Sequence, residues 1–231
     1  MNKKCLHAWP IALIFIVTLT VTSAVRAECF DKRKPGMDWS GCKKTNKMLN
    51  RQNFSGSYFD DTNFGKSNLK DSNFTNASMV KTEFTRASLN RSDFTGADMS
   101  KSSGYRAFFD NAIFSKTIMT KSEFFRASFQ GAKFSHTDMS RAEMGRADFT
   151  DAEFSNVNFE FTNLARAIFK DSKLVNVNFR GAYTFLTRFE DLDLRELAHI
   201  SQVQLELACG NEGTQLPEGL EKPDHWPCEE F

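Results

Sequence analysis

The sequence predicts an all-β solenoid made of stacked square coils, and three observations predict it. Phe, Leu or Met occupies every fifth position from Leu49 to Leu194, in 28 of the 30 positions covered, with Gly104 and Thr184 as exceptions. A small or β-branched residue stands two positions earlier through most of the run, as at Ala87 and Ser92. The other three positions are rich in Ser, Thr, Asn, Asp, Lys and Arg. A period of five fits neither the 3.6 residues of a helix nor the 2 residues of a strand.

A five-residue unit cannot bury its large side chain alone, so identical units must stack. If each unit turns the chain by about a right angle, four units close a coil of roughly 20 residues. The large residue and the small residue before it then point inward, and the other three point outward. Parallel coils rise by about 4.8 Å each, so the 30 units predict about seven coils and a rod of roughly 35 Å.

The repeated unit resembles that of the pentapeptide-repeat family, as in Ala97-Asp98-Met99-Ser100-Lys101 and Ala147-Asp148-Phe149-Thr150-Asp151. The resemblance covers 49–194 and implies a right-handed quadrilateral parallel β-helix. The C-terminal tail is similar to those of secreted bacterial members of the family. A disordered segment is the alternative, but 24 Phe and 40% hydrophobic residues argue against it.

The first 27 residues have the pattern of a secretory signal peptide. Lys3 and Lys4 precede an apolar run over 8–21, and Val25 and Ala27 occupy the −3 and −1 positions of a cleavage site. We therefore expect cleavage after Ala27 and a periplasmic or secreted bacterial protein. An uncleaved anchor is the alternative, although the run is shorter than the ~20 residues of a membrane span. No transmembrane segment is expected after cleavage.

Cleavage would remove Cys5 and leave four cysteines, Cys29, Cys42, Cys209 and Cys228. An even number in a secreted chain indicates disulfides. Two cysteines lie on each side of the repeat, and bridged Cα atoms must lie within about 7 Å. The rod therefore favours Cys29–Cys42 and Cys209–Cys228. Zinc is the alternative, but spacings of 13 and 19 residues match no finger pattern.

Both ends of a solenoid need a cap, because an end coil exposes apolar side chains and unpaired backbone groups. We assign 28–48 to an N-terminal cap and 195–231 to a C-terminal cap. Ser201 followed by Gln204 is a capping-box pattern, and Gly210 is a typical C-terminal stop, so we expect a helix over about 201–209. The tail beyond it is expected to be a loop held by Cys228 and anchored by Trp226.

The residue inventory argues against an enzyme. The four His residues are scattered along the chain, and no phosphate-binding Gly-rich loop, nucleophile elbow or His-Glu-x-x-His pattern occurs. A packed solenoid also lacks an internal cavity for a substrate. We expect no catalytic residue, no metal and no cofactor.

Outward residues spaced by 20 form columns, and two of these columns are basic. The first contains Lys66, Arg86, Arg106, Arg126, Arg146 and Arg166, and the second contains Lys81, Lys101, Lys121 and Arg141. Like charges about 5 Å apart repel by roughly 0.8 kcal/mol in bulk water. One hypothesis is a salt-bridge ladder in which Glu83, Glu123 and Glu143 pair with these cations. The other is an anion-binding edge. A candidate apolar patch adjoins it: Tyr105, Phe108, Ile113, Ile118 and Phe125.

These features predict a non-catalytic, exported protein-interaction or structural module of the cell envelope. The alternative is a binder of an anionic envelope polymer through the basic columns. The expected partner is therefore an unknown envelope protein or an anionic polymer, and a homodimer through an end cap stays open. Some members of the family mimic B-DNA and inhibit type II topoisomerases. That role needs an acidic cytoplasmic rod, whereas this chain has a formal net charge of +1 and an export signal. Nucleic acid is not an expected partner.

Overall fold

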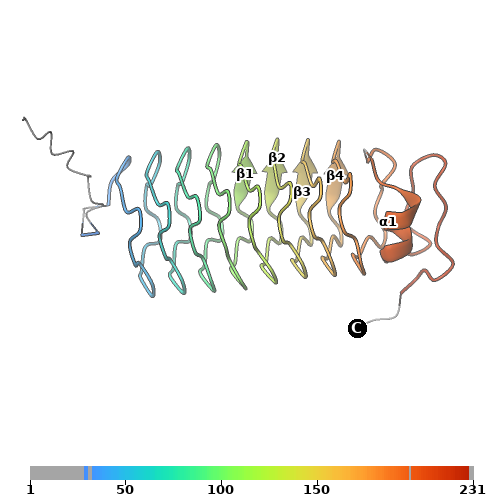
Figure 1. The fold of residues 1–231 in the computed structure, drawn as a ribbon, viewed down its shortest axis with the longest axis horizontal. Helices are drawn as coiled ribbons and strands as arrows, with labels where there is room; N and C mark the ends of the chain where they lie inside the picture. The colour runs from blue at the N-terminus through green and yellow to red at the C-terminus, as the bar shows by residue number, and fades with distance from the viewer. Residues whose placement is uncertain (1–28, 31–32, 198, 229–231) are drawn as a thin grey trace, which may run out of the picture.

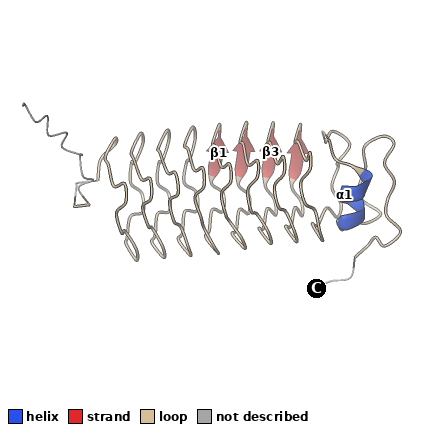
Figure 2. Ribbon diagram, viewed as in Figure 1, coloured by secondary structure: helices blue, strands red, loops and turns tan. Residues whose placement is uncertain are grey.

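The computed structural model describes residues 29–30, 33–197 and 199–228. They form one rod of stacked coils that advances steadily from the N-terminal to the C-terminal end (Figure 1). One face carries a parallel sheet in the order β1-β2-β3-β4. Its strands are β1 (Ile113–Ser115), β2 (Lys133–Ser135), β3 (Glu153–Ser155) and β4 (Lys173–Val175). The short helix α1 (Gln202–Leu207) lies at the C-terminal end, and turns and loops make up most of the rest (Figure 2).

The register of the rod is 20 residues. In the sheet, Phe114 pairs with Phe134, which pairs in turn with Phe154. Isolated parallel bridges keep this spacing on the other faces, from Asp38–Tyr58 at one end to Ile168–Arg188 at the other. Four five-residue units therefore form each coil, as the sequence pattern predicted.

The corners of the coils are made by a left-handed residue two positions after each large residue. Among the described residues from Asn46 to His199, 27 that are not glycine have φ between 51° and 61°. This conformation costs an L-residue roughly 1–2 kcal/mol relative to glycine. The corner N–H donates to a carbonyl of the next coil, as from Arg86 to Tyr105 at 3.0 Å. Each corner thus joins two coils while it turns the chain.

The interior is filled by the five-residue column of large side chains. Phe114 is completely buried, and its ring centroid lies 5.1 Å from that of Phe94 and 4.8 Å from that of Phe134. The small inward residues include buried hydroxyls, and several of these donate to carbonyls of the preceding coil. Thr117 Oγ1 donates in this way to the Phe94 carbonyl at 2.8 Å. Stacked rings and mostly hydrogen-bonded hydroxyls fill this narrow core.

Neighbouring residues explain the two exceptions to the column. A Cβ on Gly104 would lie 2.5 Å from the ring of Phe124, so that ring already occupies the space beside this glycine. Thr184 lies beneath α1, where its hydroxyl donates to the Gln204 carbonyl at 2.7 Å. The Gln204 side chain in turn donates to the Phe179 carbonyl at 2.7 Å. The polar threonine therefore replaces an apolar residue where the helix supplies polar contacts.

The sequence pattern placed the start of the first coil at Leu49, but in the structure this coil begins earlier. The Asp38–Tyr58 bridge brings the preceding segment into register. Trp39 is buried, and its ring centroid lies 5.7 Å from that of Phe54. Lys44 follows five residues later, with its ammonium nitrogen 3.4 Å from the centre of the Trp39 ring. A search for Phe, Leu and Met misses this coil because Trp and Lys fill its inward positions.

The C-terminal cap confirms the predicted helix but corrects the role of Gly210. Ser201 is the N-cap residue of α1, and its N–H donates to Gln204 Oε1 at 3.0 Å, as in a capping box. The helix ends at Ala208 in an extended conformation. Gly210 does not have a positive φ, so it is not a left-handed stop. A Cβ there would lie 2.2 Å from the Trp226 ring, which explains the glycine. Trp226 Nε1 donates to the Ala208 carbonyl at 2.8 Å, which anchors the tail as expected.

The structure contains both predicted disulfides. Cys29 is joined to Cys42 and Cys209 to Cys228, with Cα–Cα distances of 5.6 and 5.5 Å. Within 29–30, 33–197 and 199–228, no helix is long and apolar enough to cross a membrane. The predicted signal segment and its cleavage site at Ala27 lie outside the described residues.

Stacking of the buried rings should contribute most of the free energy of unfolding. Two adjacent residues of β1, one inward and one outward, test this. Phe114→Ala should lower the free energy of unfolding by about 3–5 kcal/mol, because it leaves a cavity between two stacked rings. Ile113 points outward and is 42% exposed, so Ile113→Ala should cost about 1 kcal/mol or less. Urea unfolding followed by circular dichroism measures both. Equal losses in the two variants would contradict the inward column.

Adding a side chain at Gly104 should destabilise the rod, although this glycine is an exception to the column of large residues. Gly104→Ala places its methyl against the Phe124 ring, which should cost about 1–3 kcal/mol of unfolding free energy. Combining it with Phe124→Leu should give a smaller loss than the sum of the single variants, because Leu leaves room. An additive double variant would show that Phe124 does not fill this space.

Candidate functional site

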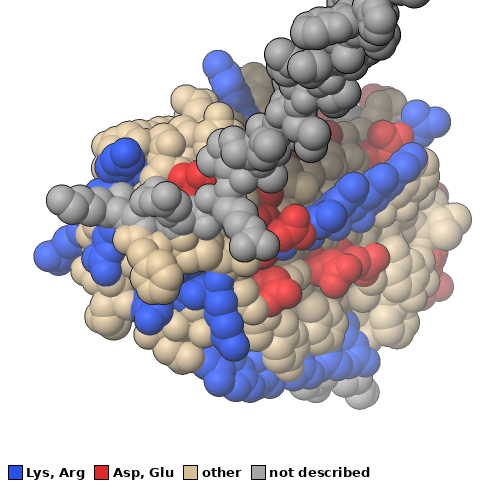
Figure 3. All heavy atoms as spheres, turned by 60° about the vertical axis from the view of Figure 1, so that its left-hand side comes forward, with Lys and Arg blue, Asp and Glu red and all other residues tan. Residues whose placement is uncertain are grey.

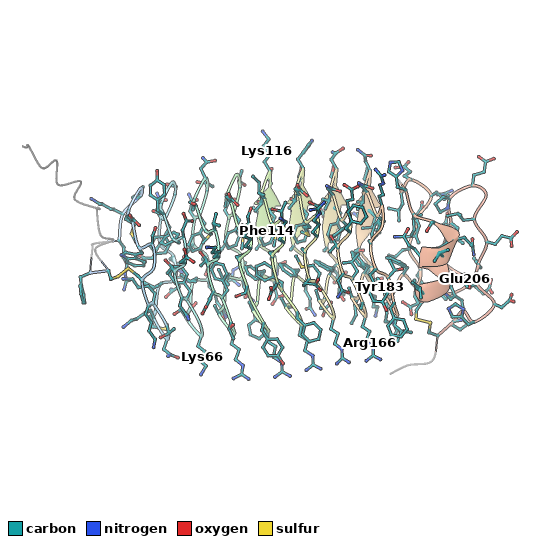
Figure 4. The ribbon with its side chains drawn as sticks, in the orientation of Figure 1. Lys66, Phe114, Lys116, Arg166, Tyr183 and Glu206 are labelled. Carbon is teal, nitrogen blue, oxygen red and sulfur yellow. A yellow bond between two sulfur atoms is a disulfide. The ribbon has the colours of Figure 1, made fainter. Side chains whose placement is uncertain are left out.

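The first basic column forms one continuous edge of the rod, which we call the basic edge. It contains Lys66, Arg86, Arg106, Arg126, Arg146 and Arg166. All six have positive φ, and each donates its backbone N–H to the next coil over 2.8–3.2 Å. Arg126 is half-buried and the other five are exposed. Lys66 and Arg166 lie on the same side of the rod and point away from it (Figure 4). The corners therefore hold six cations in a row, one per coil.

The expected salt-bridge ladder on this edge is wrong for the described residues. None of the six side chains makes an ion pair within 4.0 Å there. Glu83 instead accepts a hydrogen bond from the Asn63 amide, and Glu143 accepts one from Asn163 Nδ2 at 2.7 Å. Those carboxylates point along their own column, toward uncharged neighbours 20 residues away.

A salt-bridge ladder does form on another corner, where charges alternate along the sequence. Arg91 binds the Asp71 carboxylate with two hydrogen bonds, of 2.7 and 3.0 Å, and Arg51 approaches it at 4.0 Å. The hydrogen bond from Arg91 lowers the pKa of Asp71. Stacked side chains of opposite charge therefore form ion pairs in this fold. The basic edge lacks such pairs because acidic and basic residues do not alternate along it.

The second basic column borders the same face of the rod. Lys81 lies 3.9 Å from the Asp61 carboxylate, whereas Lys101, Lys121 and Arg141 have no ion-pair partner among the described residues. In the 20-residue register, the row Glu83, Glu123 and Glu143 lies between the two columns. Figure 3 shows rows of basic side chains along the rod, with acidic side chains between two of them.

An aromatic pair lies in the middle of the basic edge. The Tyr105 and Phe125 rings are stacked, with centroids 6.2 Å apart and planes 7° from parallel. The Arg106 guanidinium lies 5.2 Å from the Tyr105 ring centre, and that of Arg126 lies 5.5 Å from the Phe125 ring centre. Two arginines of the edge are thus positioned against apolar rings that are themselves 37% and 41% exposed.

The rest of the predicted apolar patch is not brought together. Phe108 bridges Ser88 and Ser128, Ile113 pairs with Lys133, and Ile118 bridges Asp98 and Asp138. These residues follow one another every five positions, so they lie on three other faces and form a belt around the rod. The patch expected from the sequence is wrong as one surface, and only Tyr105 and Phe125 remain with the basic edge.

The sequence reading missed a second aromatic pair farther along the same face. Tyr183 and Phe185 are stacked with centroids 6.2 Å apart, and are 49% and 39% exposed. Phe185 lies in the 20-residue column of Tyr105 and Phe125, so an extension of that column would have found it. Apolar rings therefore recur at the C-terminal end of the face.

Electrostatics differ at the C-terminal end, where carboxylates predominate. Arg195 donates three hydrogen bonds to Asp193, and they lower the pKa of this carboxyl from 3.8 to about 2. Because the folded pKa is below the ordinary value, the pair stabilises the last coil above about pH 4. That contribution falls as the pH drops toward 2.

The described surface offers little chemistry beyond charge and apolar contact. No group of three or more His, Cys, Asp or Glu side chains suited to a metal occurs in the ranges that the structure covers. A shallow surface hollow of about 340 Å³ lies over β2, β3 and β4, where Lys133 and Glu153 are 3.4 Å apart. The charge along the edges can attract a ligand of opposite sign, and Ser135 Oγ lies 3.0 Å from Nδ1 of the adjacent, exposed His136.

Several solved structures are similar to this chain. HetL from the cyanobacterium Nostoc sp. strain PCC 7120, a pentapeptide repeat protein, is 18% identical, with 83% of this chain and 88% of that one covered and a TM-score of 0.30. A trypsin-treated variant of QnrB1, a plasmid-mediated fluoroquinolone resistance protein, is 23% identical over 79% and 76%, with a TM-score of 0.41. A pentapeptide repeat protein from the Arabidopsis thaliana thylakoid lumen is 26% identical over 50% and 75%, with a TM-score of 0.33.

No curated protein sequence matches this chain. A family model described as pentapeptide repeats (8 copies) matches it over 53–91, 67–103, 82–120, 105–141 and 142–181. Together these matches span more than half of the chain, and they fall on the coils whose 20-residue register was described above. The chain belongs to the pentapeptide-repeat family.

Proposed function

We propose that this protein is an exported, non-catalytic interaction module of the cell envelope, and that its basic edge binds an anionic polymer. One observation carries the proposal. Six successive coils place a cation at the same corner, and none of these cations has an ion-pair partner among the described residues.

The backbone at this corner supports a functional reading of the cations. Left-handed corners favour Gly, Asn and Asp, and other corners of the rod use them, as at Gly96, Asn111 and Asp151. The basic edge has Lys or Arg at every coil from 66 to 166 instead. Each cation adds repulsion from its neighbours, roughly 0.8 kcal/mol per pair in bulk water at about 5 Å. This repulsion opposes folding, whereas an anionic ligand would remove it.

The rigidity of the edge favours a linear polymer over a small anion. Backbone hydrogen bonds hold neighbouring corners one coil apart, at about 4.8 Å, so the charges form a row without ordering any loop. A chain with a regular series of carboxylates, sulfates or phosphates can contact several cations at once. The Tyr105–Phe125 pair adds apolar area beside Arg106 and Arg126, which suits the ring faces of an acidic polysaccharide.

The proposed location follows from the N-terminal segment and the cysteines. The segment 1–27 has the features of a cleavable signal, and disulfides persist in oxidising compartments. A location in the periplasm or outside the cell therefore agrees with both the signal pattern and the disulfides. A structural role for the rod, with a protein as partner, uses the same edge and the same location.

A DNA mimic that binds a topoisomerase is a more distant alternative. Such a rod needs an acidic surface, whereas this chain has 30 Lys and Arg against 29 Asp and Glu. Inhibition of gyrase supercoiling by protein that lacks 1–27 but has both disulfides would favour this alternative over the present proposal.

Charge reversal on the basic edge should abolish polymer binding. The variant Arg86→Glu, Arg106→Glu and Arg126→Glu should bind polygalacturonate at least about tenfold more weakly than the wild type, since exposed ion pairs contribute about 0.2–1 kcal/mol each and reversal adds repulsion. Wild-type binding should weaken as salt rises. Isothermal titration calorimetry measures both, with neutral dextran as the uncharged probe.

A matched control reverses the same number of charges elsewhere. Lys70, Lys116 and Lys170 lie on other columns and make no ion pair with a described residue. Replacing all three by Glu should leave polygalacturonate binding within about twofold of the wild type at the same salt. Equal loss in both triple variants would reduce the binding to net charge and would overturn the basic edge as the site.

Export and disulfide formation should depend on residues 1–27. In a Gram-negative host, the full chain should appear in the osmotic-shock fraction with the four remaining cysteines protected from a maleimide reagent until a reductant is added. The variant that lacks 2–27 should stay in the cytosol with reactive cysteines, because that compartment keeps thiols reduced. A full chain that remains cytosolic would contradict the export proposal.

A further inference from the structure

The near-zero net charge of the chain conceals a strong difference between its two ends. Over 33–48, five basic residues stand against one acidic residue; the basic ones are Arg33, Lys34, Lys43, Lys44 and Lys47. Over 189–228, nine acidic residues stand against two basic ones. The coils between, 49–188, contain 19 basic and 15 acidic residues over 140 positions. The rod is therefore positive at its N-terminal end and negative at its C-terminal end.

The N-terminal end combines this positive charge with a hollow. A hollow of about 350 Å³ is lined by Arg33, Lys43, Lys44, Lys47 and the apolar Cys29, Phe30, Trp39 and Leu49. Lys43 and Lys47 are exposed. Phe30 is fully exposed and Met48 is 67% exposed. Charged and apolar groups are thus adjacent on the end coil, as at the rim and centre of a protein interface.

The C-terminal end offers the complementary surface. The tail runs over the far side of α1 (Figure 1), and it carries the exposed carboxylates of Glu218, Glu221 and Asp224. None of these three makes an ion pair with a described residue. Val203 on α1 is 70% exposed. Acidic groups and an apolar residue at this end match the basic and apolar groups of the other.

We propose that copies of this chain associate head to tail, with the acidic C-terminal cap of one rod against the basic N-terminal coil of the next. Charge complementarity selects this arrangement. Two C-terminal caps brought together would each contribute an excess of seven negative charges, so a two-fold dimer through the caps is opposed. A head-to-tail contact uses two different surfaces, and straight rods joined in this way form open chains that lengthen with concentration.

The oligomeric state of the oxidised protein at two salt concentrations tests this. At 0.01 M salt the screening length is about 30 Å and at 1 M it is about 3 Å. Sedimentation equilibrium should show a weight-average mass that rises with protein concentration at low salt, beyond that of a dimer, and returns to the 26.3 kDa chain or its processed form at high salt. A monomer at low salt, or a mass that stops at a dimer, would overturn the proposal.

Charge-swapped variants identify the surfaces. Lys43→Glu with Lys47→Glu lowers the net charge over 33–48 from +4 to zero, and Glu218→Lys with Glu221→Lys lowers the acidic excess over 189–228 from seven to three. Each double variant alone should show at least about a tenfold weaker association than the wild type. An equimolar mixture should recover association, because the reversed lysines of one variant face the reversed glutamates of the other. A mixture that stays monomeric while both variants keep wild-type circular dichroism would contradict end-to-end contact.

The variant Arg86→Glu, Arg106→Glu and Arg126→Glu distinguishes this proposal from the binding function of the basic edge. If rods join at their ends, that variant should associate as the wild type does while its polygalacturonate binding is lost. If its association is lost as well, the acidic cap docks on the side of a neighbouring rod, and the head-to-tail arrangement is wrong. The head-to-tail proposal can therefore fail while the polymer-binding proposal stands, and polymer binding can fail while head-to-tail association stands.

Discussion

The whole structure depends on the left-handed residue that ends each five-residue unit. Its positive φ turns the chain by about a quarter of a coil, and its N–H reaches a carbonyl of the following coil, as from Arg106 to Phe125. Because every corner from Asn46 to Arg166 does both, four units close a coil in register with the next, and Phe114 stacks directly between Phe94 and Phe134. The energy of the ring column offsets the roughly 1–2 kcal/mol that each non-glycine corner costs.

The same constraint turns the surface into a set of straight columns. Any residue type that recurs at 20-residue intervals becomes a continuous row, whatever lies between in the sequence. Where Arg51, Asp71 and Arg91 alternate, the row pairs internally and becomes a ladder. Where Lys or Arg recurs without alternation, as on the basic edge, the row is left open to ligands. The core does not constrain these outward positions, and the proposed binding function rests on them.

The ends of the rod follow different rules, since an end coil has a neighbour on one side only. Lys44 can occupy an inward position because it lies over the Trp39 ring in the first coil. At the other end, α1 replaces a unit of the coil, and the Trp226 ring fills the space beside Gly210. Exposed end positions can hold charged residues, and the sequence places basic ones at the N-terminal end and acidic ones at the C-terminal end.

The sequence by itself determined the inward half of this protein. The narrow interior accepts only a large apolar residue and a small one per unit, so the period of five predicts the coil and the 20-residue register. Ser201 with Gln204 predicted the capping helix, and two cysteines on each side of the repeat predicted the disulfide pairing. Tertiary structure alone decided which outward groups meet. Glu143 bonds Asn163 rather than an arginine, and Phe108, Ile113 and Ile118 fall on different faces. Each outward side chain has several neighbours within reach, on its own coil and on the coils on either side, and only their positions in space select among these contacts.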